Sequence, residues 1–265
     1  MLTRLRLCLG AALTAAALAT MTATGALAAT ASLEVTRFDR TDLKAAQAAR
    51  TSALGGSAVR GSEFFGDYKA WDGKAGTTNP QNTKVGSFSS FGAKGSGHSV
   101  VGDASKLQVR NDPSMPWGRY GTSESAALGG NWLDSNDNLG MRWDVASSKG
   151  KFNSVSFFVL DAADVGGKFS IKVGDQLFSN IAGSKARLAN GNIQFVRIML
   201  SEAVSSLRVE LMHDRTNDGF GVDGASVALA PIPLPPAAFL MLGGIAGFGF
   251  LRRRRTGAAP APAAA

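Results

Sequence analysis

The sequence has only one cysteine and two histidines in 265 residues. Cys8 lies inside an N-terminal segment with the pattern of a secretory signal peptide, so the mature chain is predicted to contain no cysteine. This excludes a disulfide framework, a zinc thiolate site and a cysteine nucleophile. The chemistry of the protein must therefore depend on other side chains.

Catalytic motifs are equally scarce. His98 lies in a Gly/Ser-rich stretch, and His213 continues the apolar alternation of the residues before it, which predicts a partly buried residue at a strand end. No G-x-S-x-G turn is present, and no pattern in the sequence brings two carboxylates together as a glycosidase requires. The sequence therefore predicts a protein that is not an enzyme.

The basic excess of the chain belongs to its two ends. The sequence has 28 Lys and Arg against 20 Asp and Glu, but six of the arginines are Arg4, Arg6 and residues 252–255. Removing these six leaves 22 basic residues against 20 acidic ones. A basic patch for nucleic acid is therefore not expected, and we predict no nucleic-acid partner.

The N-terminus has the three parts of an export signal. Arg4 and Arg6 precede an apolar, alanine-rich stretch, which ends at Ala26-Leu27-Ala28-Ala29. A positive start, an apolar middle and an A-x-A exit are typical of a secretory signal peptide. We therefore expect residues 1–29 to direct the chain to the Sec machinery and to be removed by signal peptidase.

The C-terminal segment 231–255 also has three blocks. Prolines at 231, 233, 235 and 236 hold the approach extended, and a glycine-containing apolar run follows. Spanning a bilayer takes roughly 20 apolar residues, so residues 234–251 form a short candidate transmembrane helix. Four arginines, Arg252, Arg253, Arg254 and Arg255, would stay on the cytoplasmic side and stop transfer. Residues 256–265 are Ala/Pro-rich and predicted to be disordered.

This order of blocks resembles the PEP-CTERM group of bacterial sorting signals, and the motif is similar to its VPLPA variant. The residues that carry the motif are Ile232, Pro233, Leu234, Pro235, Pro236 and Ala237. The family pattern has Val at the position of Ile232 and Ala at that of Pro236, and this chain continues past the arginines. The resemblance implies processing by an exosortase-type transpeptidase, transient anchoring in the inner membrane, and transfer to the surface or exopolysaccharide matrix of a Gram-negative bacterium. A plain C-terminal anchor is the alternative.

The intervening residues 30–230 are predicted to form one antiparallel β-sandwich, with a jelly roll favoured. Residues 168–173 and 207–212 alternate apolar and polar side chains, as strands with one solvated face do. Residues 155–160 and 193–200 are nearly continuous β-formers, and a parity slip at Phe195-Val196 indicates either a bulge or a strand covered on both faces. Gly166-Gly167 and Gly174-Asp175 are predicted turns. One short helix, residues 42–50 with Thr41 as N-cap, is predicted.

A further resemblance supports the sandwich. The stretch Asp218-Gly219-Phe220-Gly221-Val222-Asp223 is similar to the closing DGFG-x-D segment of β-sandwich modules found ahead of such sorting tails. This similarity implies a fold and does not imply an activity.

Two loops are rich in Asp and Asn, the oxygen ligands that calcium requires. The candidate calcium ligands are Asp134, Asp137, Asp218 and Asp223. Neither loop has the EF-hand spacing. The same residue types also fill turns, because they hydrogen bond to their own backbone and tolerate left-handed conformations. A structural calcium ion and simple turn chemistry therefore remain as alternatives.

Exposed aromatic side chains would give a carbohydrate-binding module its stacking faces. Trp117, Tyr120 and Trp132 are the candidates, whereas Trp143 alternates with Met141 and Val145 and is predicted to lie in the core. Two functions remain from the sequence. One is a non-catalytic matrix or surface protein, and the other is a glycan-binding module delivered by the same tail.

Overall fold

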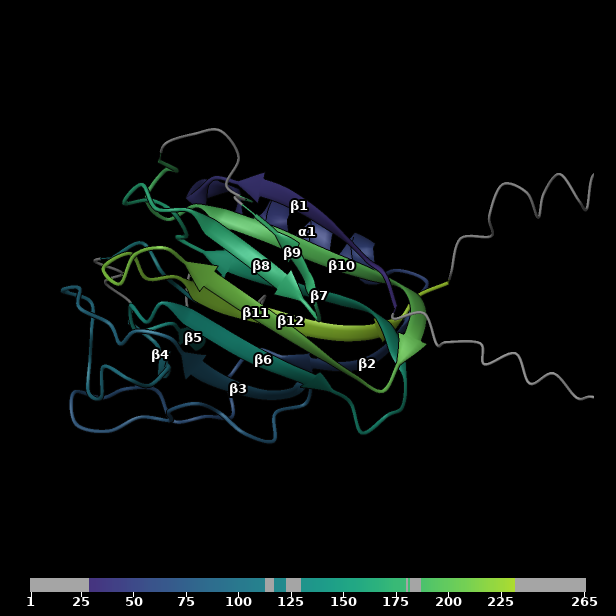
Figure 1. Ribbon diagram of the computed structural model, residues 1–265, viewed down its shortest axis with the longest axis horizontal. Coiled ribbons are helices and arrows are strands. Elements are labelled where there is room, and N and C mark those ends of the chain that lie inside the picture. Colours follow the sequence, from purple (N-terminus) through teal and green to yellow (C-terminus); the bar gives the residue numbers. More distant parts are fainter. Residues whose placement is uncertain (1–28, 113–116, 123–129, 180, 182–186, 232–265) are drawn as a thin grey trace, which may run out of the picture.

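In the computed structural model, described for residues 29–112, 117–122, 130–179, 181 and 187–231, two antiparallel β-sheets pack face to face and one α-helix lies outside them (Figure 1). The β-sandwich predicted from the sequence is therefore confirmed. The strands are β1 (Ala31–Phe38), β2 (Ala58–Glu63), β3 (Gly86–Phe91), β4 (Gln108–Arg110), β5 (Trp132–Asp134), β6 (Gly140–Ala146), β7 (Phe152–Leu160), β8 (Phe169–Val173), β9 (Gln176–Phe178), β10 (Ile193–Val204), β11 (Ser206–His213) and β12 (Gly221–Leu229). The helices are the 3₁₀ turn η1 (Arg40–Asp42) and α1 (Leu43–Leu54).

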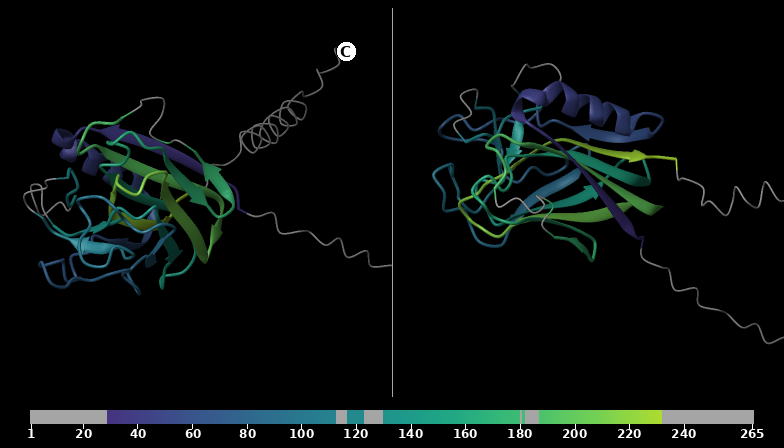
Figure 2. Two further views of the ribbon diagram at one scale, coloured as in Figure 1. Left: turned by 60° about the vertical axis from the view of Figure 1, so that its left-hand side comes forward. Right: turned by 90° about the horizontal axis from the view of Figure 1, so that it is seen from above.

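The larger sheet has the order β1-β10-β7-β12-β5-β4, with β2 also paired to β12. Its central strands β7 and β12 are buried along almost their whole length. They are covered on one face by the second sheet and on the other by α1, which packs on the outer face of this sheet (Figure 2). Burial on both faces explains why the sequence of β7 has no polar alternation.

The smaller sheet has the order β3-β6-β11-β8-β9. Burial alternates along β8 and through most of β11, as the sequence predicted, because only their inner faces meet the core. The predicted turn at Gly174-Asp175 joins β8 to β9 as a two-residue hairpin, and Gly174 has the positive φ of 56° that such a turn favours.

Aromatic side chains fill the space between the sheets. The Phe88 and Trp143 rings stack with centroids 5.2 Å apart, and Phe157 meets Trp143 edge-on. The indole Nε1 of Trp143 donates a hydrogen bond to the Val85 carbonyl oxygen at 2.9 Å, so this buried polar group is satisfied. The core position predicted for Trp143 is confirmed.

The parity slip in β10 has a specific structural cause. Phe195 pairs with Phe158, and Val196 with Phe157, without any break in register. Phe195 packs in the cluster beneath α1, whereas Val196 faces the core between the sheets. The strand is therefore covered on both faces at this point, and the irregular register lies later, between Met199 and Val204.

The predicted helix exists, but its predicted start is wrong. Thr41 lies inside η1, and the N-cap position of α1 is Asp42, whose side chain makes no capping hydrogen bond. The helix also continues to Leu54. The packing of Leu43 and Ala46 against β10 and its neighbours selects the helical segment in place of a cap.

The first and last strands place the two ends of the described chain at the same end of the domain. β1 starts and β12 finishes there, whereas the loops before β12 and after β7 gather at the far end (Figures 1 and 2). In the described part of the chain, no helix combines the length and the hydrophobicity needed to cross a membrane. The predicted signal peptide and the sorting segment with its arginine cluster lie outside the described residues, apart from Ala29 and Pro231.

Candidate functional site

A polar cavity of about 290 Å³ lies at the loop end of the sandwich. Loops from both sheets contribute to it, and its walls carry carboxylates, amides, one guanidinium and one indole. The lining residues are Gly97, His98, Ser99, Trp117, Arg119, Asp137, Asp161, Asp164, Val165, Asn190, Asn217, Asp218 and Gly219. Its volume is close to the lower end of small-ligand pockets.

Arg119 organises one wall of the cavity. Its Nη1 lies 2.7 Å from Oδ1 of Asp134 and 3.3 Å from Oδ1 of Asp137, and the residue is only 5% exposed. Asp134 also contacts Arg110, whose Nη1 lies 3.1 Å from its Oδ2. Burial acts against the charged guanidinium, but the carboxylates of Asp134, Asp137 and Asp161 outweigh it and hold the pKa of Arg119 above its ordinary value. Arg119 therefore stays charged.

Three more aspartates, Asp161, Asp164 and Asp218, form another part of the cavity wall. Burial, reinforced by the charge of Asp164, raises the pKa of Asp161 to about 8, while its Oδ1 accepts a 2.6 Å hydrogen bond from the Gly191 amide. Burial, followed by the charge of Asp218, raises the pKa of Asp164 to about 6.

Asp218 behaves in the opposite way. Burial alone would raise its pKa, but the adjacent His213, whose Nε2 lies 3.2 Å from Oδ2 of Asp218, lowers it. The wall thus combines an ionised carboxylate with two carboxyl groups that resist ionisation.

Glycine is required where the backbone passes over these groups. Gly118 has a φ of 80°, and a Cβ there would overlap the side chains of Asn190 and Asp161. A Cβ on Gly219 would overlap Arg119 and Asp137. The chain can pass this close to the buried charges only because both residues lack a side chain.

Trp117 is the sequence-predicted aromatic residue that reaches solvent. Its side chain lines the cavity and the residue is 44% exposed. Tyr120 and Trp132 are only 1% and 2% exposed, so neither presents a ring face to a ligand in this structure. Both pack beneath α1, and the Tyr120 hydroxyl donates to the Gly191 carbonyl oxygen at 3.1 Å. Sequence proximity to Trp117 did not reveal that these two rings point into the core.

The four predicted calcium ligands do not converge on one point. Asp134 and Asp137 share Arg119, whereas Asp218 faces His213. Asp223 accepts hydrogen bonds from the amide and hydroxyl of Thr122, at 2.6 and 2.9 Å, and from the amide of Gly224. Among the described residues, no group of three or more His, Cys, Asp or Glu side chains is arranged to hold a metal ion.

The Asp/Asn loop after β5 has the turn chemistry that the sequence offered as the alternative. Asn136 and Asp137 have positive φ values of 55° and 59°. The Asn136 side chain accepts from the Val101 amide and donates to the carbonyl oxygens of Val101 and Asp103. This loop therefore fixes the long segment between β3 and β4, which carries His98 and Ser99 to the cavity.

Sequence reasoning missed Asp161, Asp164, Arg119 and Asn190. The signal for the first two was present, because Asp161-Ala-Ala-Asp164 directly follows the buried strand β7. Two carboxylates at a strand end are placed at a sheet edge, where loops form sites. Arg119 carried no signal, since its role depends on partners from other loops.

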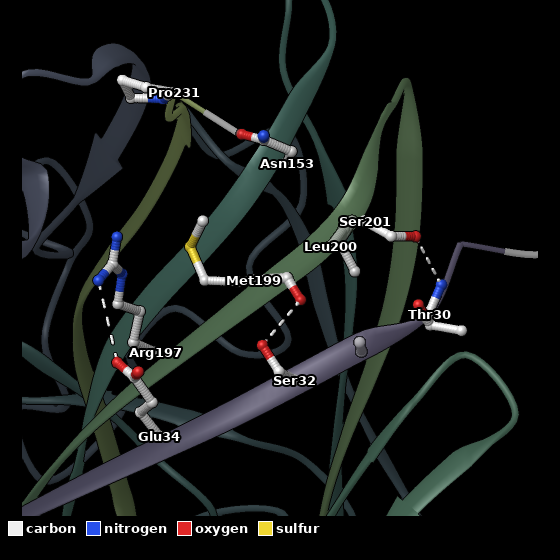
Figure 3. A pocket seen from close by; sticks show the side chains of 10 residues that line it. Thr30, Ser32, Glu34, Asn153, Arg197, Met199, Leu200, Ser201 and Pro231 are labelled. Carbon is white, nitrogen blue, oxygen red and sulfur yellow. Dashed lines mark hydrogen bonds and ion pairs between the residues drawn. The ribbon is translucent and has the colours of Figure 1, made fainter. Parts of the chain in front are cut away.

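A second cavity, of about 450 Å³, lies at the other end of the sandwich (Figure 3). It is lined by β1, β10 and the chain around Pro231. Its two charged side chains, Glu34 and Arg197, form an ion pair with Oε2 and Nη1 3.9 Å apart, and the amide of Thr30 donates to Ser201 Oγ. Its charges are thus already matched, unlike those of the loop-end cavity.

A scan against models of protein families finds no match, and a search of curated proteins finds none either. The functional interpretation therefore rests on the geometry and chemistry of the loop-end cavity.

Proposed function

We propose that this protein is an exported, non-catalytic module that binds carbohydrate in the loop-end cavity. The observation that carries the proposal is the half-exposed indole of Trp117, which lines the same cavity as several carboxylate and amide groups. Sugars stack their apolar ring face on aromatic side chains. Their hydroxyl groups hydrogen bond to Asp and Asn, which here are supplied by Asp164, Asn190 and Asn217.

Export and sorting form the second part of the proposal, and the sequence supports them. Residues 1–29 act as the signal peptide, and the motif Ile232 to Ala237 with its apolar run and Arg252 to Arg255 acts as the sorting tail. The partners would be the Sec machinery, signal peptidase and an exosortase-type transpeptidase. The destination would be the cell surface or exopolysaccharide matrix. We also assign the sandwich to the jelly-roll type, because most strands that are consecutive in the sequence lie in different sheets. β1 and β2 lie in the same sheet but do not pair with each other.

The arrangement of the domain agrees with this reading. The chain leaves the sandwich at Pro231, at the end opposite the loops that form the cavity (Figure 1). A domain tethered through its tail would therefore present the cavity away from the membrane.

The test is a binding screen with soluble polysaccharides and oligosaccharides, read by tryptophan fluorescence and by calorimetry. Trp117→Ala should abolish binding, because removal of an exposed ring takes away the stacking face and leaves the core intact. Leu177→Ala is the matched control, since Leu177 is a large apolar residue that is 55% exposed on β9 of the smaller sheet and does not line the cavity. Unchanged emission across the panel would reject carbohydrate binding and favour a purely structural matrix protein.

A further inference from the structure

The loop-end cavity has an unbalanced charge. Four of its lining residues are aspartates, Asp137, Asp161, Asp164 and Asp218, and its one guanidinium, on Arg119, is shared with Asp134 outside the cavity. The other titratable or charged groups near these carboxylates are His98 on the wall, His213 and Asp214 behind Asp218, and Arg187 and Arg215, which hydrogen bond to the backbone carbonyls of Asp164 and Val165. The wall formed by Asp161, Asp164 and Asp218 is therefore acidic.

One of these carboxylates has an oxygen without a fixed donor. Asp218 is 1% exposed, and no amide, hydroxyl or basic group in the described part of the chain donates to its Oδ1. The Asp164 carboxyl group also hydrogen bonds to the Asp218 side chain, but it can donate only while it is protonated. Its other oxygen accepts from the Val165 amide at 3.2 Å and faces His213. A buried carboxylate oxygen without a donor costs free energy, which a donor on a ligand would recover.

The neighbouring carboxyl groups of Asp161 and Asp164 are also held in surroundings that disfavour negative charge. Burial and mutual repulsion raise the pKa values of Asp161 and Asp164. A cation placed between Asp164 and Asp218 would relieve that repulsion and favour the ionised form of Asp164. A neutral ligand would leave the repulsion in place, and an anionic ligand would increase it.

We propose that the cavity selects an amino sugar, a hexosamine unit whose primary amine is free and protonated. The ammonium group would donate to Asp164 and to Oδ1 of Asp218, while the sugar ring lies on Trp117. This inference rests on the proposed carbohydrate-binding function and names the class of sugar. An ammonium group suits the site better than a metal ion, because it directs its own N–H donors at separate carboxylate acceptors and does not need a close shell of oxygens.

The experiment compares two hexosamine oligomers of equal length, one fully N-acetylated and one with free amines. Binding is measured by calorimetry near neutral pH, at low and at high ionic strength, with the full mature protein. The de-acetylated oligomer should bind about ten-fold more tightly or better, since only its ammonium groups can form charge-assisted hydrogen bonds with the carboxylates. High salt should reduce this preference.

The preference should depend on the acidic wall. Asp164→Asn should bring the affinity for the de-acetylated oligomer down to that for the acetylated one, and Asp218→Asn should do the same. Glu202→Gln is the matched control, because it removes one negative charge from the exposed end of β10, away from the cavity. Melting temperatures identify any variant that fails to fold; Asp164, which is only half-buried, then carries the test alone.

Each outcome has a defined meaning. If both oligomers bind with equal affinity and Trp117→Ala abolishes that binding, the carbohydrate-binding function stands and the amino-sugar assignment is overturned. No binding of either oligomer or of any other glycan would overturn both. Spermidine is the probe for charge without a sugar ring, and binding of spermidine as tight as that of the oligomer would overturn the assignment in favour of a general cation site.

Discussion

The Nε2 atom of His213 lies 3.2 Å from Oδ2 of Asp218, and both side chains are fully buried. His213 is the last residue of β11, and Asp218 lies in the loop that leads to β12. The Phe169 ring, 6.2 Å away by centroid, packs against the imidazole. This pair therefore connects the hydrophobic core to the wall of the cavity.

His213→Leu should destabilise the protein by about 3 kcal/mol at neutral pH, because it leaves a buried carboxylate without its partner. The folded-state pKa of Asp218 is lowered in the wild type, so its stabilising contribution is present above the ordinary aspartate pKa and is lost as pH falls through the lowered value. The loss caused by the variant should accordingly shrink in acid. Urea denaturation of both proteins at neutral and at acid pH measures this loss of unfolding free energy. An equal loss at both pH values, or no recovery in the double variant with Asp218→Asn, would contradict the pairing.

Asp161 should give protein stability the opposite pH dependence. Its pKa is raised to about 8, so between the ordinary aspartate value and about 8 the folded state holds a proton that the unfolded state has lost. Stability should therefore fall as pH rises through this window. Each such proton contributes a slope of about 1.4 kcal/mol per pH unit.

Asp161→Asn should remove that part of the slope and keep the acceptor for the Gly191 amide. Asp223, with a pKa raised by burial to about 7, still contributes in the variant and keeps some slope. Thermal melts across the pH range compare the two proteins. Parallel curves would show that Asp161 ionises normally in the folded state.

Gly118→Ala tests the close packing over the charged cluster. Gly150→Ala is its control, because Gly150 also has a positive φ, of 99°, but has open space where a Cβ would lie. The control should cost about 1 kcal/mol from backbone strain alone. Gly118→Ala should cost clearly more and weaken ligand binding, since the new methyl group displaces Asn190 and Asp161. Equal unfolding free energies for the two variants would reject this close packing.

If the C-terminal segment acts as a sorting tail, the native protein should be a processed form of the chain. Intact mass of the native protein should lack residues at both ends, and fractionation should find it outside the inner membrane. Replacement of Pro233, Leu234 and Pro235 by alanine should hold a full-length C-terminus in the membrane. A full-length C-terminus in both proteins would make the tail a simple anchor.

Periodicity predicted the strands well because each signal is local. The alternation in β8 and β11 reports one buried face, and the continuous apolar run of β7 reports two. The packing of α1 on β10 is visible in the sequence only as the parity slip at Phe195-Val196. The helix boundary was wrong because packing of Leu43, and not a cap, decides it.

The candidate site was much harder to predict. Trp117 is exposed, as a stacking residue must be, but Tyr120 belongs to the core, because three residues of chain are enough to turn a ring from solvent to the interior. The Asp residues were named as metal ligands, whereas several of them meet arginine, histidine or backbone amides from distant loops. Such partners come together only through the topology of the two sheets.

The pairing of β1 with β10 also sets the order of folding. Ala31 lies opposite Leu200, so the edge strand that opens the domain finds its partner only after most of the chain has been made. Non-local pairing of this kind slows folding. In a chain exported through Sec, the sandwich would therefore close after its last strands have crossed the membrane, and until then β1 would lack its partner strand and could pair with other chains.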